Sequence, residues 1–489
     1  MFRYFWFVML AGMLLGQTAA AEPDGFIHRP ALIRGSFEQL ALPANESMGM
    51  LGVNYLLETL PHLYVGGAAY GALTGQRGGF FTVGTEVAWH QKLFQQWEWQ
   101  AGLYAGGGGG GGATALVGGG LMLRPHVDLM WDFGAYRAGL SASSVSFPSG
   151  QISSNQLGLV FSADTEFLQL DPLHLGEPPM VRQRSGVGFD RVHAVAGIYQ
   201  GQVFARSGTG NTIGLVGFRM EQMRSAYSFW GIEAAGAASG GAAGYAEFLG
   251  TVGVEAPMLE ERAAIGARVA AGMGGGGAVS VGGGQLYKLG GYATVNLSRD
   301  THLSLEGGYA AAPDGQLRAR YAVTNLTMDL DHPDDPSGDA QINRYEGLLG
   351  ANRYAATAHK DGSVSVMDVV ALKVNRYIGD TIYLSGQAHS AFQGKEGGYS
   401  AGLFGVGMRF SGWFDRVALG AEMLLGAAGG GGVESSGGAI VAPNAYLDWQ
   451  LDDWFTLRLG SGRIKSLGGA LDSQSVNVAI KFSYAAASR

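Results

Sequence analysis

The sequence predicts an all-β protein whose antiparallel strands form a transmembrane β-barrel. Three observations carry this prediction. Nearly every segment after the N-terminus alternates apolar with small or polar residues, one unit of eight strands occurs three times, and glycine is far above its ordinary usage, at 83 of 489 residues. Charged residues make up only 15% of the chain and apolar residues 47%, which indicates strands that face lipid.

The first 21 residues have the pattern of a secretory signal peptide. Arg3 supplies a positive charge, residues 4–15 are uncharged and mostly apolar, and Ala19 and Ala21 fit the small-x-small rule for cleavage after Ala20 or Ala21. The apolar run is too short for a spanning helix, and no later stretch approaches 18 apolar residues without a charge or a run of glycines. We therefore expect export, and membrane spans made of strands.

The period-two alternation is clear within single strands. In residues 97–104, Trp97 and Leu103 share one face, and Glu98 and Gln100 share the other. In the first unit we expect strands near residues 32–42, 48–57, 63–73, 79–90, 97–106, 120–132, 135–146 and 152–163. Aromatic residues gather near strand ends, as in the interfacial girdles of membrane barrels: Trp89, Trp97, Trp131, Trp413, Phe414, Trp454 and Phe455.

An internal repeat organises the chain. The pair Gly79-Phe80 recurs as Gly244-Tyr245 and Gly398-Tyr399, at offsets of 165 and 154 residues, and several other glycines obey the same two offsets. A polyglycine tract connects the fifth and sixth strands in every unit. We interpret it as a tolerated low-complexity hairpin, and the alternatives are a loop that packs closely under another loop and one that leaves a pore mouth open. The expected segments are a signal peptide (1–21), unit 1 (22–170), a linker (171–190), unit 2 (191–330), an acidic linker (331–341) and unit 3 (342–489).

The strand count leaves two ways of closing the sheet. One ring of about 24 strands would exceed the roughly 22 strands of large barrels whose lumen needs a plug, whereas eight strands can close alone around packed side chains. The proline-containing linkers favour three tandem eight-stranded barrels. Inward glycines such as Gly102, Gly266 and Gly420 would leave narrow barrels underfilled. We therefore expect the single ring and keep the three tandem barrels as the alternative.

A family resemblance rests on the signal peptide, the girdled strands and the last strand, where Val476, Val478, Ile480, Phe482 and Tyr484 share one face. In these features the chain resembles Gram-negative outer-membrane β-barrels of the porin-like class. The resemblance covers the whole chain after the signal peptide. It implies a location in the cell outer membrane, with outer-membrane lipids and the barrel-assembly machinery as partners.

Metal and nucleic-acid chemistry find little support in the sequence. The absence of cysteine excludes disulfides and thiolate metal sites, and the net charge of −8 argues against a nucleic-acid partner. Asp331, Asp334 and Asp335 form a candidate Ca²⁺ site. The neighbouring Pro333 and Pro336 favour a solvated tether instead.

Catalysis and cofactors are also not expected. His126 and Asp128 lie two residues apart on one strand face, so they could act as base and orienter. Neither residue recurs at the matching positions of the second unit, which are glycine and alanine, and no serine nucleophile is marked out. We expect a protein that is not an enzyme and that holds no cofactor.

The expected function is an outer-membrane pore or export conduit for a polar solute or polymer. Its selectivity would be set by inward charges, for which the pore-lining candidates are Glu98, Arg268, Glu422 and Arg458. The alternative is a non-conducting surface or scaffold protein, or an accessory secretion protein, made of small closed barrels. In that case the same charges would pair inside packed interiors.

Overall fold

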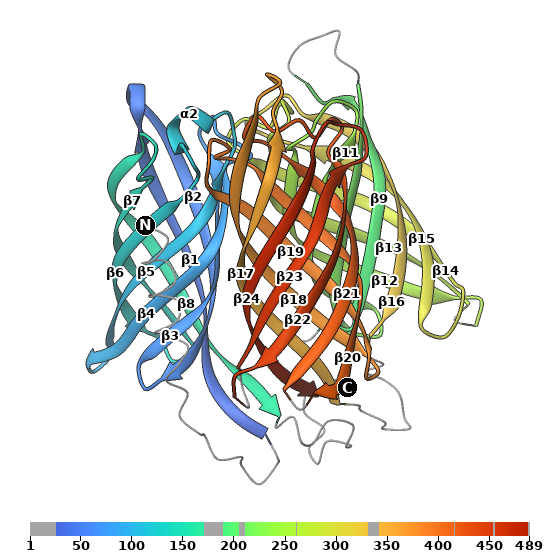
Figure 1. Ribbon diagram of the computed structural model, residues 1–489, viewed down its shortest axis with the longest axis horizontal. Helices are drawn as coiled ribbons and strands as arrows, with labels where there is room; N and C mark the ends of the chain where they lie inside the picture. The colour runs from blue at the N-terminus through green and yellow to red at the C-terminus, as the bar shows by residue number, and fades with distance from the viewer. Residues whose placement is uncertain are drawn as a thin grey trace.

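The computed structural model describes residues 26–170, 189–204, 211–260, 262–330, 342–414, 416–452 and 455–487, and it consists almost entirely of strands (Figure 1). The signal peptide (1–21), residues 171–188 of the first linker and the acidic linker (331–341) with Asp331, Asp334 and Asp335 lie outside these residues. Among the residues described, no helix is long and apolar enough to cross a membrane.

The described residues form 24 strands and two short helical turns, and the strands pair antiparallel throughout. The first eight strands are β1 Phe26–Leu42, β2 Glu46–Leu60, β3 Leu63–Thr74, β4 Phe81–Phe94, β5 Trp97–Gly109, β6 Met122–Asp132, β7 Tyr136–Ser146 and β8 Ser153–Leu170, with η1 Pro43–Asn45 and α2 Thr114–Val117. The second eight are β9 Arg191–Gln202, β10 Thr212–Ser225, β11 Ser228–Ser239, β12 Ala246–Met258, β13 Ala263–Gly275, β14 Gln285–Asn296, β15 Thr301–Ala311 and β16 Arg318–Asp329. The last eight are β17 Ile342–Ala358, β18 Val364–Ile378, β19 Ile382–Gln393, β20 Ser400–Phe414, β21 Val417–Gly429, β22 Ala439–Gln450, β23 Phe455–Ser466 and β24 Asp472–Ala487.

Each group of eight strands closes on itself. Strand β1 pairs with β8, β9 with β16 and β17 with β24, which gives three closed barrels that lie side by side (Figure 1). We call them barrels 1, 2 and 3 in chain order. The antiparallel barrel architecture and the three units of eight strands are confirmed. The single ring of 24 strands is wrong, and the alternative of three tandem barrels is what the structure shows.

The side chains that lie opposite the inward glycines explain why three narrow barrels form and not one ring. Gly266 faces Tyr292 across the strand pair, Gly420 faces Tyr446, and a Cβ at either glycine would overlap with the partner's ring. Gly102 is covered in the same way by the His126 ring. Because a side chain from the neighbouring strand fills each of these positions, glycines do not leave the narrow barrels underfilled.

The two ends of the barrels differ. We call the end where β1 begins and β24 ends, at the bottom of Figure 1, the terminal end, and the end that carries α2 the cap end. At the cap end an apolar cluster fills each barrel, and connecting segments contribute to it, as Phe80, Val117 and Phe147 do in barrel 1. Equivalent clusters fill barrel 2 and barrel 3. Below these caps the interiors are mostly polar, and barrel 1 also has a small apolar cluster of Leu32, Leu56, Tyr64 and Ala88.

Two differences from the expected strands have local causes. Strands β1 and β8 pair from Phe26 opposite Leu170, beyond the expected limits of 32 and 163, and the charged residues in these extensions hide the alternation. The polyglycine connection of barrel 1 also contains the helix α2, which has only four residues and so leaves no helical period in the sequence.

Candidate functional site: barrel interiors and the glycine contacts between barrels

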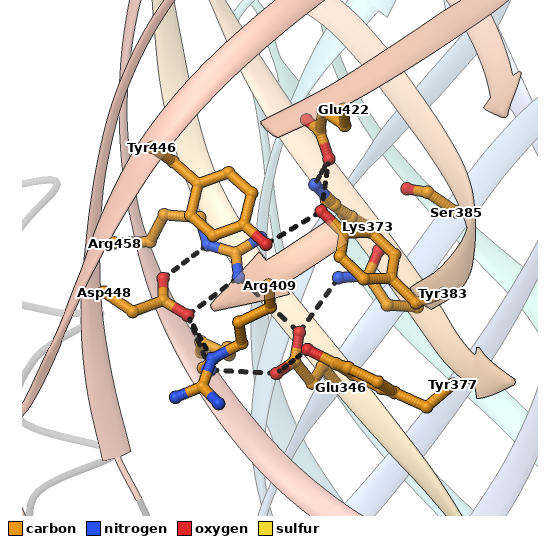
Figure 2. Close-up of polar contacts among 12 residues, drawn as sticks. Glu346, Lys373, Tyr377, Tyr383, Ser385, Arg409, Glu422, Tyr446, Asp448 and Arg458 are labelled. Carbon is orange, nitrogen blue, oxygen red and sulfur yellow. Dashed lines mark hydrogen bonds and ion pairs between the residues drawn. The ribbon is translucent and has the colours of Figure 1, made fainter. Parts of the chain in front are cut away.

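Buried ions fill the polar part of barrel 3 (Figure 2). The guanidinium of Arg458 donates two hydrogen bonds to Asp448, of 2.6 and 2.9 Å, and lies 3.5 Å from Glu346. Lys481 bridges the same two carboxylates, at 2.7 Å from Asp448 and 2.9 Å from Glu346. The four side chains come from β17, β22, β23 and β24 and are almost fully buried, so each strand contributes a charge that another strand neutralises.

A second group in barrel 3 surrounds Glu422 on β21. Lys373 forms an ion pair with this carboxylate, and Tyr383, Gln387 and Asn444 donate hydrogen bonds to it at 3.1–3.2 Å. The hydroxyl groups of Tyr383 and Tyr446 are also hydrogen-bonded to each other at 2.9 Å, and the Tyr446 ring lies 3.6 Å from the guanidinium carbon of Arg458, which joins the Glu422 group to the Arg458 group (Figure 2). The network therefore ties together opposite walls of the barrel.

Barrel 2 has an interior of the same kind. Arg219 lies 2.7 Å from Glu233 and 3.3 Å from Glu306, and Arg268 also pairs with Glu306. Lys288 completes the network, 2.6 Å from Glu233. Tyrosine hydroxyls donate to the remaining carboxylate oxygens, so the buried charges are both paired and hydrogen-bonded.

In barrel 1 the His126–Asp128 pair is part of the buried network. The Nδ1 atom of His126 lies 3.0 Å from Asp128, its Nε2 atom lies 3.1 Å from Glu86, and Arg34 lies 2.7 Å from Asp128. All four side chains are at most 3% exposed. Both imidazole nitrogens are thus engaged by carboxylates, and the group holds the barrel wall together.

The four residues predicted to line a pore all point into barrel interiors, in ion pairs. Glu98 contacts His90 at 2.9 Å and pairs with Arg137, while Arg268, Glu422 and Arg458 belong to the networks described above. Each is at most 7% exposed. The structure groups Glu422 with Arg458 in barrel 3 and places Glu98 and Arg268 in separate barrels, so a pore-lining role for the four remains a prediction.

Within the described ranges, no cluster of three or more His, Asp or Glu side chains is arranged to hold a metal ion. The Ca²⁺ candidates Asp331, Asp334 and Asp335 lie outside those ranges.

The repeated glycines form the contacts between barrels at the cap end. A Cβ at Gly79 in barrel 1 would overlap with the backbone of Gly276 in barrel 2. The same contact recurs between barrels 2 and 3, where a Cβ at Gly244 would lie 2.8 Å from Gly430 N, and between barrels 3 and 1, where one at Gly398 would lie 2.7 Å from Gly110 N. The contact therefore runs from barrel 1 to 2, 2 to 3 and 3 back to 1.

Backbone hydrogen bonds reinforce this ring of glycine contacts. Gly78 N donates to Gly282 O at 2.9 Å, between barrels 1 and 2, and Gly397 N donates to Gly118 O at 3.0 Å, between barrels 3 and 1. Only residues without side chains allow two backbones to approach this closely. The polyglycine tracts therefore pack against a neighbouring loop, which was an alternative to the low-complexity hairpin that the sequence favoured.

Apolar side chains extend the contacts along the barrel walls. Val83 of barrel 1 packs with Val370 and Phe392 of barrel 3, and all three are buried although they point out of their own barrels. Between barrels 1 and 2, the rings of Phe81 and Phe248 stack at a centroid distance of 4.3 Å and an angle of 13°. The outward strand faces at these contacts between barrels are thus buried, whereas large apolar side chains on the outward faces elsewhere are exposed.

The known proteins that this chain is similar to are found among solved structures. No family model matches the chain, and no curated protein matches it. Among solved structures, the chain is similar to OccK8 (OprE) of Pseudomonas aeruginosa, with 8% identity over 94% of this chain and 99% of that one and a TM-score of 0.21. It is similar to the outer-membrane channel DcaP of Acinetobacter baumannii, with 9% identity over 96% and 100% and a TM-score of 0.20. It is also similar to the ferric enterobactin receptor PfeA of Pseudomonas aeruginosa, with 9% identity over 96% and 81% and a TM-score of 0.29. At these TM-scores the alignments carry no argument about barrel arrangement or function.

Sequence reasoning missed the tyrosines that fill the barrels. Tyr70, Tyr199, Tyr245, Tyr383 and Tyr446 are buried beside the charged networks, where their hydroxyl groups hydrogen-bond to carboxylates or to one another. A signal for some of them exists, because an inward glycine on one strand faces a tyrosine on the next. Finding it requires the strand register, which the sequence alone does not fix.

Proposed function

We propose that the chain is an outer-membrane protein of three closed barrels that acts as a non-conducting surface scaffold or accessory secretion element. One observation carries the proposal: in every barrel an apolar cap lies above a network of paired, buried ions, so the space a pore would need is occupied by side chains. Outer-membrane lipids and the barrel-assembly machinery are its proposed partners.

The outward faces support insertion in a membrane. Along β16 exposed and buried residues alternate almost without exception. On the free walls, which are the outward strand faces that no other barrel covers, large apolar side chains such as Leu159 (63%) and Leu305 (64%) are exposed. Aromatic side chains gather at the terminal end, where Trp89, Trp131 and Trp449 are exposed. The side chains of Trp413, Phe414 and Trp454, which belong to the expected girdle, lie outside those that the structure describes.

A charge on the free wall tests the membrane assignment. We expect Leu305→Arg in mid-β15 to lower the free energy of folding into lipid vesicles by about 2–4 kcal/mol, because the guanidinium would face hydrocarbon. Urea titration of vesicle-bound protein measures the effect. Leu259→Arg is the matched control, since Leu259 is exposed in the turn between β12 and β13. Equal effects of the two substitutions would contradict a lipid-facing wall.

The occupied interiors predict electrical silence. Purified protein should insert into a planar bilayer without a stable conductance, because the cap and the ion network block each barrel. Heat-modifiable mobility on a gel should confirm that the inserted protein is folded. A stable conductance of porin size from such a sample would contradict the scaffold proposal and favour the pore.

A pore through barrel 3 is the second candidate. It is favoured by a cavity inside that barrel, which is lined by two of the predicted pore-lining residues, Glu422 and Arg458. In this case conduction would depend on motion of the apolar cap, and the solute would pass both charges inside the barrel.

A further inference from the structure

The cavity in barrel 3 lies where the apolar cap meets the charged network. Its volume is about 50 Å³, and its lining includes Leu403 and Leu424 from the cap and Lys373 and Arg458 from the network. A space of this size holds roughly three or four water molecules or one small ion. At the equivalent junction of apolar cluster and charged network in barrel 2, the ring centroids of Tyr199 and Tyr321 lie 5.5 and 5.1 Å from the Nζ atom of Lys288.

Arg458 lines the cavity, and one of its donor atoms has no acceptor. Arg458 is 2% exposed; its Nε and Nη2 atoms donate to Asp448, and its Nη1 atom has no hydrogen-bond partner among the described residues. A buried donor without an acceptor is costly, so the site favours an acceptor that the protein itself does not provide. The ring of Tyr446, 3.6 Å from the guanidinium carbon, holds the group in place (Figure 2).

The charge balance of the barrel gives the sign of that acceptor. The inward cations on the described strands of barrel 3 are Arg344, Lys373, Arg409, Arg458 and Lys481. The carboxylates that they face are Glu346, Glu422 and Asp448, and the buried Glu396 beside His359 in the β19–β20 connection adds a fourth, so one positive charge remains. In barrel 2 the balance is reversed, because Glu221, Glu233, Glu247, Glu255, Glu306 and Asp329 face four cations. Of the charged side chains that line the cavity itself, Lys373, Arg458 and Arg463 are cations and Glu422 is a carboxylate, and such a surplus of positive charge attracts anions.

The lining of the cavity also provides a route and further donors. Arg463, whose side chain is largely exposed on β23, lines the same cavity, so the cavity extends toward the surface. The amide groups of Asn352 and Asn477 lie in the wall as well. Amide and guanidinium N–H groups are the donors that proteins use to hold anions.

We propose that barrel 3 binds a small monovalent anion, such as a halide, at the Nη1 atom of Arg458. Lys373 contributes positive charge, and the amides of Asn352 and Asn477 contribute further N–H groups. This inference goes beyond the proposed function, because a barrel can bind an anion without conducting it.

Bromide is the probe that tests the proposal. Crystals of the full chain, grown without chloride and soaked in sodium bromide, should show an anomalous peak in this cavity. Parallel soaks in rubidium acetate should show none there. An empty cavity after the bromide soak, or a rubidium peak in it, would overturn the proposal. Because the readout is occupancy, its outcome is independent of the conductance measurement.

Two variants show whether Arg458 holds the ion. Arg458→Lys keeps the positive charge beside Asp448 but removes the free Nη1 donor, so bromide affinity should fall about tenfold, the order expected for one hydrogen bond to an ion. Arg219→Lys in barrel 2 is the matched control and should leave the bromide peak unchanged. Should Arg458→Lys not fold, Asn477→Leu removes a wall amide without touching the ion pairs and should also lower the occupancy. Full bromide occupancy in the folded Arg458 variant, or in Asn477→Leu, would contradict the assigned site.

Discussion

Asp448→Ala is expected to lower the free energy of unfolding of barrel 3 by about 3–5 kcal/mol, because it leaves buried cations without their carboxylate. Asp448 accepts two hydrogen bonds from Arg458 and one from Lys481, and all three side chains are at most 2% exposed. Equilibrium unfolding of the full chain in urea from lipid vesicles, followed by tryptophan fluorescence, measures the change.

The control for Asp448 is an exposed pair in the same barrel. Asp472 accepts a hydrogen bond of 2.5 Å from Arg463 at the edge of β23 and β24, but both side chains face solvent. Asp472→Ala should leave the urea midpoint unchanged, because exposed ion pairs contribute little. Asp448→Asn should fall between the two, since it keeps the shape and one acceptor oxygen. Equal unfolding midpoints for Asp448→Ala and Asp472→Ala would show that the buried network does not stabilise the barrel.

The second large effect is expected at the glycine contacts. Gly107 of barrel 1 packs against the backbone of Ser390 and Ala391 in barrel 3, and Gly283 of barrel 2 packs against Thr74 in barrel 1. The double variant Gly107→Val and Gly283→Val overpacks both contacts of barrel 1. We expect it to weaken the attachment of barrel 1 by about 2–6 kcal/mol, the sum of two overpacked sites.

Separation of the barrels can be measured after the chain is cut. Protease sites placed within residues 171–188 and 331–341 would leave the barrels joined only by their mutual contacts. After cleavage in detergent, the parent protein should migrate as one complex on a native gel, whereas the double variant should release barrel 1. Gly402→Val is the control, because a Cβ at Gly402 meets nothing within 4 Å. Release of barrel 1 from the cleaved parent would contradict a stabilising role for the glycine contacts.

The local pattern of the chain was sufficient to predict its strands. Alternation along residues 97–106 and the tight connections between strands gave eight strands per unit, and the recurrence of Gly79-Phe80 gave three units. The local pattern could not show which strands pair to close each barrel. Whether β8 pairs with β1 or with β9 depends on contacts between residues far apart in the chain, and the alternation of β8 is compatible with either partner.

The interior shows the same limit. Glu422 and Arg458 could be placed on inward faces from alternation alone, and the structure has them inside barrel 3. Their partners Lys373 and Asp448 lie on other strands, so identifying the pairs requires the register. The glycines in Gly106–Gly112 were visible as a repeat, but they touch another barrel, and no signal within one unit reveals that neighbour.

The ring of glycine contacts has no first or last barrel. In each barrel, the loop between the third and fourth strands packs against the glycine tract of one neighbour, and the barrel's own glycine tract contacts the corresponding loop of the other neighbour. Barrel 3 closes the ring on barrel 1. The chain links two of the three junctions covalently and leaves the third open. Circular permutation would therefore only change which junction lacks a linker, because β1 begins and β24 ends at the same end of the barrels (Figure 1). Within such a closed ring, the side chains inside one barrel can differ from those inside the others, as the charge balance of barrel 3 differs from that of barrel 2. The glycine contacts between the barrels still keep the three barrels in place.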